Sequence, residues 1–139
     1  MMDNTVIYCR TANSDVDIVE MQEEMLKQYA QANGYNLKAT YCDWNVSGVT
    51  LDRPALKKLL SDVCAGKVQR IIVKDISRLA RSFFLAGELF CLFSKYGVEL
   101  IAVNDGGVVD TLWKNNDLTD AMAAFLKKEK KRRSKAAAV

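Results

Sequence analysis

The sequence predicts an α/β fold in which a mostly parallel sheet of four to five strands is flanked by helices. Short runs of β-branched and aromatic residues alternate four times with longer stretches whose apolar residues recur at helical spacing. The segments that link successive strand-like runs are too long for hairpins, which favours parallel crossovers. With 139 residues, of which 50% are hydrophobic, the chain is long enough for one domain with its own core.

The first strand and helix are predicted from the opening third of the chain. Residues 5–10 are β-branched and aromatic and are expected to form a buried strand that ends at Arg10. A helix follows, with Asp15 or Asp17 as its candidate N-cap, and the Asn-Gly pair at 33–34 ends it.

A second strand and helix follow in the same order. Apolar residues alternate along residues 37–42, as in a strand, and residues 43–52 form a polar connection. Pro54 marks the first turn of a helix that ends at the Ala-Gly pair 65–66.

The third strand, residues 71–73, runs directly into the polar stretch 74–81. Apolar residues at helical spacing then predict a helix over residues 83–93, which stops at Tyr-Gly 96–97. Residues 98–103 are predicted to form the fourth strand.

After a glycine turn, residues 108–111 predict a short edge strand, and residues 117–135 predict a helix. We therefore expect a body over residues 1–112 and a long, basic C-terminal helix within residues 113–139. The apolar stripe of this helix fades into charge, so its far half is expected to leave the body.

The net charge of +3 is unevenly distributed. Residues 127–135 hold seven basic residues and one acid, whereas the rest of the chain has a net charge of −3. A basic segment on such a body favours contact with a polyanion, above all nucleic acid; the alternative is a solvated helix end whose cations suit the helix dipole. The candidate DNA-binding residues are Lys127, Lys128, Lys130, Lys131, Arg132, Arg133 and Lys135.

Several classes of function are excluded or disfavoured by composition. The chain has no histidine, so imidazole catalysis is excluded and a zinc site is not expected. Its four cysteines occur singly and are interpreted as core residues in a reducing cytoplasm. No apolar run is long enough to span a membrane, and no signal peptide is recognisable. We expect neither a metal nor another cofactor.

Four arginines follow the predicted strands or lie in the loops after them: Arg10, Arg53, Arg78 and Arg81. The carboxyl ends of strands in an open α/β sheet are the usual place for a ligand site. Arginines there can bind a phosphate through paired, permanently charged donors, which also stabilise charge that develops on a phosphodiester. We therefore expect a phosphate pocket suited to phosphoryl transfer without a metal; the alternative is a strand end with solvated arginines.

The chain resembles the N-terminal catalytic domain of the serine recombinases, the resolvase/invertase family, and most of all the large serine recombinases of mobile elements. The resemblance spans residues 5–107 and depends on an ordered set of motifs. These motifs are Ile7-Tyr8-Cys9-Arg10, Gln22, Ser47-Gly48, Leu51-Asp52-Arg53-Pro54-Ala55-Leu56, Val73-Lys74-Asp75-Ile76-Ser77-Arg78-Leu79-Ala80-Arg81 and Gly97-Val98-Glu99-Leu100-Ile101-Ala102-Val103-Asn104-Asp105-Gly106.

This resemblance implies a three-layer-like resolvase catalytic domain that cuts and rejoins double-stranded DNA through a phosphoserine link. The four arginines match the family's active-site arginines, and Gln22 and Ser47 match its supporting polar residues. The C-terminal helix matches the helix that pairs subunits and runs toward DNA. A homo-oligomer is implied, as a dimer and as a tetramer in synapsis.

One position departs from the family pattern. The resemblance places the serine nucleophile two residues after the first arginine, and the residue here is Ala12. A methyl group cannot attack phosphorus. Thr11 and Ser14 are nearby hydroxyls, but Thr11 is expected to face the opposite way and Ser14 lies about 6–7 Å further along. The glycine of the motif around the arginine pair is Ala80, a change that should be tolerated.

These observations leave more than one function open. The first is a site-specific recombinase catalytic domain that is impaired in cleavage, and the sequence alone leaves open whether the chain acts as an enzyme. The second is a non-catalytic DNA-binding or assembly partner of an active recombinase. A nucleotide-binding domain is disfavoured because no GxGxxG or GxxxxGK loop is present.

Overall fold

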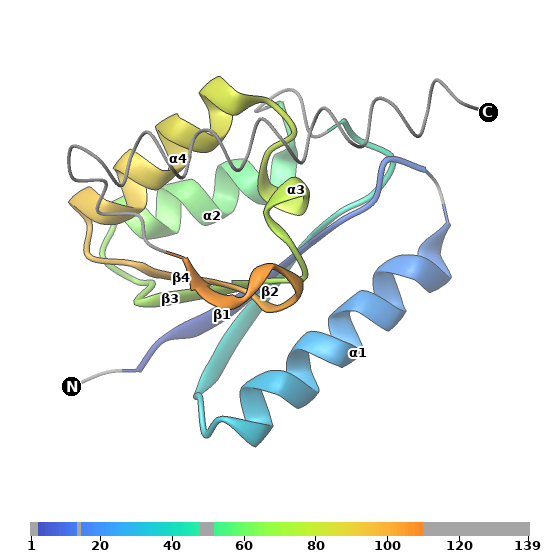
Figure 1. Ribbon diagram of the computed structural model, residues 1–139, viewed down its shortest axis with the longest axis horizontal. Helices are drawn as coiled ribbons and strands as arrows, with labels where there is room; N and C mark the ends of the chain where they lie inside the picture. Colours follow the sequence, from blue (N-terminus) through green and yellow to red (C-terminus); the bar gives the residue numbers. More distant parts are fainter. Residues whose placement is uncertain (1–2, 14, 48–51, 110–139) are drawn as a thin grey trace.

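The computed structural model describes residues 3–13, 15–47 and 52–109 and shows a five-stranded, mostly parallel sheet in the order β2-β1-β3-β4-β5 (Figure 1). The α/β fold predicted from the sequence is confirmed. The strands are β1 Thr5–Arg10, β2 Leu37–Asp43, β3 Arg70–Val73, β4 Glu99–Ala102 and β5 Gly107–Val109.

The pairing pattern brings the carboxyl ends of four strands to one edge. β1 pairs in parallel with β2 on one side and with β3 on the other, and β3 pairs in parallel with β4. Only β5 among the described strands is antiparallel to its neighbour. Parallel strands end at the same side of a sheet, so the segments that follow β1, β2, β3 and β4 lie there.

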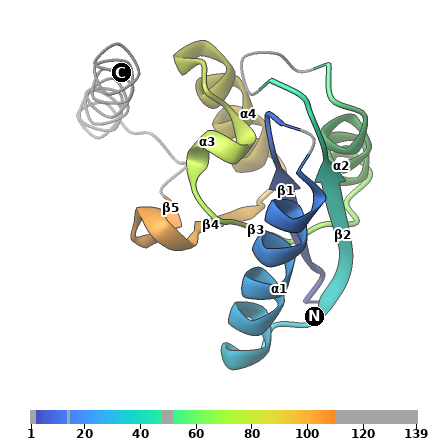
Figure 2. The same ribbon diagram turned by 90° about the vertical axis from the view of Figure 1, so that its right-hand side faces the viewer.

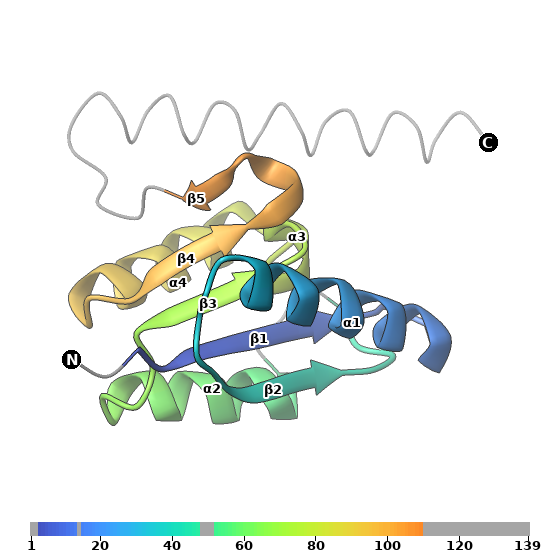
Figure 3. The ribbon, with the colours of Figure 1, turned by 90° about the horizontal axis from the view of Figure 1, so that it is seen from below.

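Helices cover both faces of the sheet. One face packs against α1 (Val16–Ala32), and the other packs against α2 (Pro54–Cys64) and α4 (Phe83–Lys95), as Figures 2 and 3 show. The strands alternate accordingly: Ile7 and Ile72 point to the α1 face, whereas Val6 and Ile71 point to the α2–α4 face. The short helix α3 (Ile76–Leu79) follows β3 at the carboxyl edge.

The helix boundaries follow local signals in the sequence. The Asp15 side chain caps α1 by accepting a hydrogen bond from the Asp17 amide at 3.0 Å. Asn33 is the C-cap of the same helix, and Gly34 follows with φ +70°, a left-handed conformation that favours glycine.

The second half differs from the sequence prediction in detail. β4 ends at Ala102, one residue earlier than predicted, because Val103, expected to end the strand, begins the 3₁₀ turn η1 (Val103–Asp105). The edge strand β5 comes one residue earlier than predicted. The C-terminal helix expected within residues 113–139, including the basic residues 127–135, lies outside the described residues. Within the described ranges, no helix is long and apolar enough to cross a membrane.

Candidate functional site

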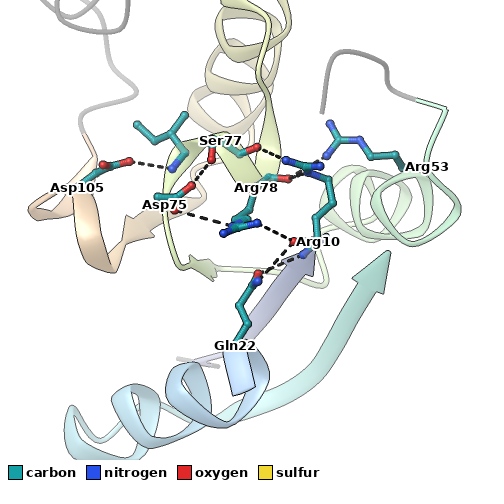
Figure 4. Close-up of polar contacts among 8 residues, drawn as sticks. Arg10, Gln22, Arg53, Asp75, Ser77, Arg78 and Asp105 are labelled. Atoms are coloured by element: carbon teal, nitrogen blue, oxygen red, sulfur yellow. Dashed lines mark hydrogen bonds and ion pairs between the residues drawn. The ribbon is translucent and has the colours of Figure 1, made fainter. Parts of the chain in front are cut away.

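Arg10, the last residue of β1, is fully buried, and its guanidinium binds backbone carbonyl oxygens (Figure 4). Its Nε donates to the carbonyl of Arg78 at 3.0 Å, and its Nη2 donates to the carbonyl of Ser77 at 2.8 Å. Its Nη1 donates to the carbonyl of Val46, in the loop after β2, at 2.9 Å. The carbonyls at the end of a short helix lack partners within the helix, so Arg10 satisfies two such groups of α3.

Arg53 approaches the same helix from the start of α2. It precedes Pro54 with an extended backbone, and its side chain is also fully buried. Its Nη1 donates to the Arg78 carbonyl at 2.9 Å and to the Tyr8 hydroxyl at 3.2 Å, and its Nη2 donates to the Leu79 carbonyl. Arg10 and Arg53 together therefore fix the carboxyl end of α3 against β1 and α2.

Asp43, the last residue of β2, holds the start of α2 in place. Its Oδ1 accepts a hydrogen bond from the amide of Ala55 at 2.9 Å, and its Oδ2 accepts one from the amide of Leu56 at 3.0 Å. Its Oδ2 also accepts a hydrogen bond from the Tyr8 hydroxyl at 2.7 Å. Burial raises the pKa of Tyr8 well above its usual value, so this hydroxyl keeps its proton. Through the helix start and Tyr8, Asp43 positions Arg53.

Sequence reasoning did not single out Tyr8 or Asp43 as site residues. Tyr8 was expected as part of a buried strand and of the motif Ile7-Tyr8-Cys9-Arg10, and Asp43 as the first residue of a polar connection. The sequence nevertheless held a signal that the start of α2 needs an acceptor from another element. The N-cap position of α2 is Arg53, which makes no capping hydrogen bond of its own, so the two orphan amides of that helix require an acceptor from elsewhere.

Gln22 of α1 lies against the backbone of Arg10 and is buried. Its Oε1 accepts a hydrogen bond from the Arg10 amide at 3.1 Å, and its Nε2 donates to the Arg10 carbonyl at 3.4 Å. One amide side chain thus satisfies both backbone groups of Arg10 at the point where β1 ends.

Arg78 lies between Arg10 and Asp75 (Figure 4). Its Nη1 donates to the Arg10 carbonyl at 3.2 Å. Its Nε lies 3.8 Å from Asp75 Oδ2 and is buried without a hydrogen-bond partner among the described residues. The Arg78 guanidinium therefore keeps a donor that is not satisfied within the described part of the chain.

Two carboxylates accept hydrogen bonds at the amino end of α3. Asp105 Oδ2 accepts a hydrogen bond from the Ile76 amide at 2.8 Å, and Asp75 accepts one from the Ser77 hydroxyl. Ser77 is buried, so its hydroxyl is committed to Asp75 rather than turned to solvent.

Arg81 completes the group of arginines and differs from the others because it is exposed. It makes no hydrogen bond or ion pair with the described residues. Burial, together with the charges of Arg53 and Arg81, lowers the pKa of Arg10 to about 10. Arg53 and Arg81 therefore add positive charge near Arg10, and several positive charges at one edge favour an anion there. We call the residues Arg10, Arg53, Arg78 and Arg81 the arginine edge.

The loop after β1 exposes Ala12 and buries its neighbour. Thr11 is 3% exposed, and its hydroxyl donates to Asn13 Oδ1 at 2.9 Å. Ala12 itself is exposed. Ser47 is exposed next to Val46, the residue whose carbonyl binds Arg10, while Ser14 lies outside the described residues.

The structure thus brings together Arg10, Arg53, Arg78 and Gln22 in one hydrogen-bonded network. This network differs in one respect from the expected phosphate pocket, in which all four arginines turn their donors toward the phosphate. The guanidinium groups of Arg10 and Arg53 face backbone carbonyls, leaving Arg78 and Arg81 as the arginines with uncommitted donors. Among the described residues, no three His, Cys, Asp or Glu side chains come close enough to hold a metal ion.

The mostly parallel sheet, with Arg10 buried at the end of β1, Arg53 buried at the start of α2 and Arg78 partly buried in α3, defines an α/β domain with a cationic edge. The family model described as the resolvase N-terminal domain matches residues 5–138, and the chain belongs to this family, the serine recombinases. The family suggested by the sequence motifs is thereby confirmed.

Solved structures agree with this assignment. The N-terminal catalytic domain of TP901-1 integrase has a TM-score of 0.75 and 23% identity, covering 94% of this chain and 97% of that domain. A resolvase family site-specific recombinase from Streptococcus pneumoniae has a TM-score of 0.71 and 24% identity, covering 98% of this chain and 93% of that chain. At these identities the likeness shows the fold.

A third structure is more similar in sequence. The C-terminal catalytic domain of ISC1926 TnpA, an IS607-like serine recombinase, is 32% identical with a TM-score of 0.68, covering 72% of this chain and 68% of that one. No curated protein matches the chain significantly.

Proposed function

We propose that this chain is a site-specific recombinase catalytic domain that contacts duplex DNA at its arginine edge but is impaired in strand cleavage. The observation that carries the proposal is Ala12. The family places its serine nucleophile at this position, and the residue present lies on an exposed loop directly after Arg10 with no atom able to attack phosphorus.

The hydroxyls near this loop support the proposal. Thr11 is buried and donates to Asn13, and Ser77 is buried and donates to Asp75. A nucleophile must reach near-contact distance from phosphorus, so neither hydroxyl is available without a change of conformation. Ser14 is the remaining candidate in this segment, and the experiment below tests it.

The proposed roles of the site residues follow from their positions. Arg78 and Arg81 supply donors for a phosphate of the DNA backbone. Arg10 and Arg53 are held by backbone carbonyls at α3, so they can turn toward a phosphate only if α3 moves. Gln22 supports the backbone of Arg10, and we propose Ser47 as a further polar contact.

Contact with DNA beyond the arginine edge is assigned to the basic residues of 127–135, whose charge suits the phosphate backbone. Self-association as a dimer, or as a tetramer on paired sites, is part of the same proposal. A role in the integration of a mobile element and a cytoplasmic location are also proposed.

One structural observation favours a second candidate, a non-catalytic assembly partner of an active recombinase. The guanidinium groups of Arg10 and Arg53 already donate to backbone carbonyls, so they stabilise the fold and are not turned toward a substrate. A chain of this kind would keep the surfaces that bind DNA and other subunits while cleavage is left to the partner.

The experiment has two stages because the DNA target is not specified by the sequence. First, the full chain selects binding duplexes from a random pool at low salt. Second, a supercoiled circle that carries the selected duplex is incubated with the unaltered protein, with Ala12→Ser, and with Ala12→Ser/Arg81→Ala as a control. Denaturing gels then show whether a protease-sensitive DNA adduct has formed.

An adduct with Ala12→Ser alone supports a recombinase silenced at its nucleophile. An adduct with the unaltered protein contradicts the proposal, because another hydroxyl, Ser14 first, must then attack. Selective DNA binding without any adduct favours the assembly partner. If no duplex is enriched, the proposed DNA contact itself is wrong.

A further inference from the structure

Two cysteines lie side by side at the carboxyl edge of the sheet. Cys9 of β1 and Cys42 of β2 are direct partners in the parallel register, and the next pair in that register is Arg10 with Asp43. Both cysteines belong to the α1 face of the sheet. Neighbouring strands are about 4.8 Å apart, which is within the Cα separation that a disulfide spans.

The two thiols differ in access and in acidity. Cys9 is fully buried, whereas Cys42 is half-buried. The interaction between the two thiols lowers the pKa of Cys42 and, together with burial, raises the pKa of Cys9. Two charged residues of α1 also act on the thiols: Glu23 raises the pKa of both cysteines, and Lys27 lowers the pKa of Cys42. Glu23 and Lys27 form an ion pair with each other at 3.0 Å. Cys42 is therefore the sulfur that reacts first.

We propose that Cys9 and Cys42 form a redox-active pair, in which a peroxide closes a reversible disulfide across β1 and β2 and displaces the arginine edge. The Cys42 thiolate attacks a peroxide oxygen, which breaks the O–O bond, gives a sulfenic acid and releases hydroxide, or an alkoxide from an organic peroxide. The Cys9 sulfur then attacks the Cys42 sulfur, the S–O bond breaks, and the thiol proton leaves with the oxygen as water.

Geometry explains why such a bond would be reversible. Side chains of a parallel pair stand roughly parallel to each other, so their Cβ atoms are separated by about the strand spacing of ~4.8 Å. A disulfide prefers a Cβ separation of roughly 3.8 Å, so the two strand ends must move to close the bond. Strained disulfides have more oxidising potentials and are readily reduced, which suits a transient bridge in a reducing compartment.

The bridge would reach the site through the backbone. Arg10 and Asp43 directly follow the two cysteines, and Arg10 binds the carbonyls of Ser77 and Arg78 while Asp43 caps α2. A shift of the strand ends therefore changes the hydrogen bonds that fix α3. This coupling concerns the geometry of the edge and does not depend on the proposed contact with DNA.

The test uses the full chain with the two exposed cysteines removed, as Cys64→Ser/Cys91→Ser, so that Cys9 and Cys42 are the remaining thiols. The protein is treated with hydrogen peroxide, alkylated, digested with trypsin and analysed by mass spectrometry. Cys9 falls in the peptide 1–10 and Cys42 in the peptide 39–57, because trypsin does not cut the bond between Arg53 and Pro54, so a bridge joins two defined peptides. The same protein with Cys9→Ala is the matched control.

We expect a joined peptide pair that dithiothreitol separates, and its absence from the Cys9→Ala control. In amide NMR spectra, the signals of Arg10 and Asp43 should shift on oxidation, while those of β5 stay in place. Recovery of Cys9 and Cys42 as separate peptides, alkylated or oxidised to sulfinic acid, would overturn the proposal. A bridge that leaves the Arg10 and Asp43 signals unchanged would overturn its coupling to the arginine edge.

Discussion

The guanidinium groups of Arg10 and Arg53 share one acceptor, the backbone carbonyl oxygen of Arg78, at 3.0 and 2.9 Å. One arginine ends β1 and the other precedes α2, so this single oxygen ties two distant segments to α3. Both guanidiniums are fully buried, and their charge is compensated mainly by carbonyl dipoles. The two arginines therefore stabilise the conformation of α3 in addition to any role toward phosphate.

The first prediction concerns Arg53→Ala, which should lower the free energy of unfolding by about 3 kcal/mol. The substitution removes charged hydrogen bonds to the carbonyls of Arg78 and Leu79 and leaves a cavity beside Tyr8. Urea denaturation followed by circular dichroism measures the change. Arg81→Ala is the matched control, since its exposed side chain should change stability by less than about 0.5 kcal/mol. Equal midpoints for the two variants would show that Arg53 does not hold α3.

The second prediction concerns the carboxylate that caps α2. Asp43→Ala should lower the free energy of unfolding by about 2–3 kcal/mol, because it leaves the amides of Ala55 and Leu56 and the Tyr8 hydroxyl without an acceptor. Urea denaturation again measures the effect. Asp52→Ala is the control: Asp52 precedes the same helix but is exposed and pairs with Lys57. A similar loss in both variants would mean that the effect reflects negative charge near the helix rather than the cap.

Much of the fold could be predicted because the sequence pattern is locally consistent. The boundaries of β1 were predicted to the residue, and the Asn-Gly pair and Pro54 marked helix ends that the structure confirms. The exception is the segment after β4. Val103 was expected to end that strand, but it begins a 3₁₀ turn from which Asp105 reaches the amide of Ile76. The turn allows a contact with the Ile76 amide, which lies far from Asp105 in the sequence and therefore leaves no local signal.

The site could be predicted only in part, for the same physical reason. Convergence of the arginines follows from parallel strand order, which alternation in the sequence reveals. Their burial does not follow, because it depends on orphan carbonyls of α3 that no local pattern indicates. The sequence also does not show that Tyr8 joins Asp43 to Arg53, since these residues come from three separate elements.

The third prediction is a dependence of stability on acid pH that arises from Tyr41 and Asp62. The Tyr41 hydroxyl donates to Asp62 Oδ2 at 2.5 Å, which lowers the pKa of Asp62 below its usual 3.8. An acid with a depressed pKa in the folded state contributes stability above pH 3.8, and this contribution is lost as the pH falls through the folded value. Tyr41→Phe should therefore be less stable than the unaltered protein at pH 7.

The difference between Tyr41→Phe and the unaltered protein should shrink as the pH falls below 3.8. Urea denaturation at a series of pH values measures it, with Tyr29→Phe as the matched control on α1. A difference that stays constant from neutral to acid pH would show that the stabilisation by Tyr41 does not depend on the ionised form of Asp62.

The fourth prediction tests the arginine edge as a DNA contact. Arg81 is exposed, lies in the segment that joins α3 to α4, and makes no hydrogen bond or ion pair with the described residues. Arg81→Ala should therefore weaken binding to all duplexes several-fold and reduce the slope of log affinity against log salt by about 1. Fluorescence anisotropy of a labelled duplex at several salt concentrations measures both quantities. Lys38→Ala is the matched control, because Lys38 is an exposed cation near the amino end of β2, away from the arginine edge. An unchanged salt slope for Arg81→Ala, or the same reduction for Lys38→Ala, would contradict a phosphate contact at this edge.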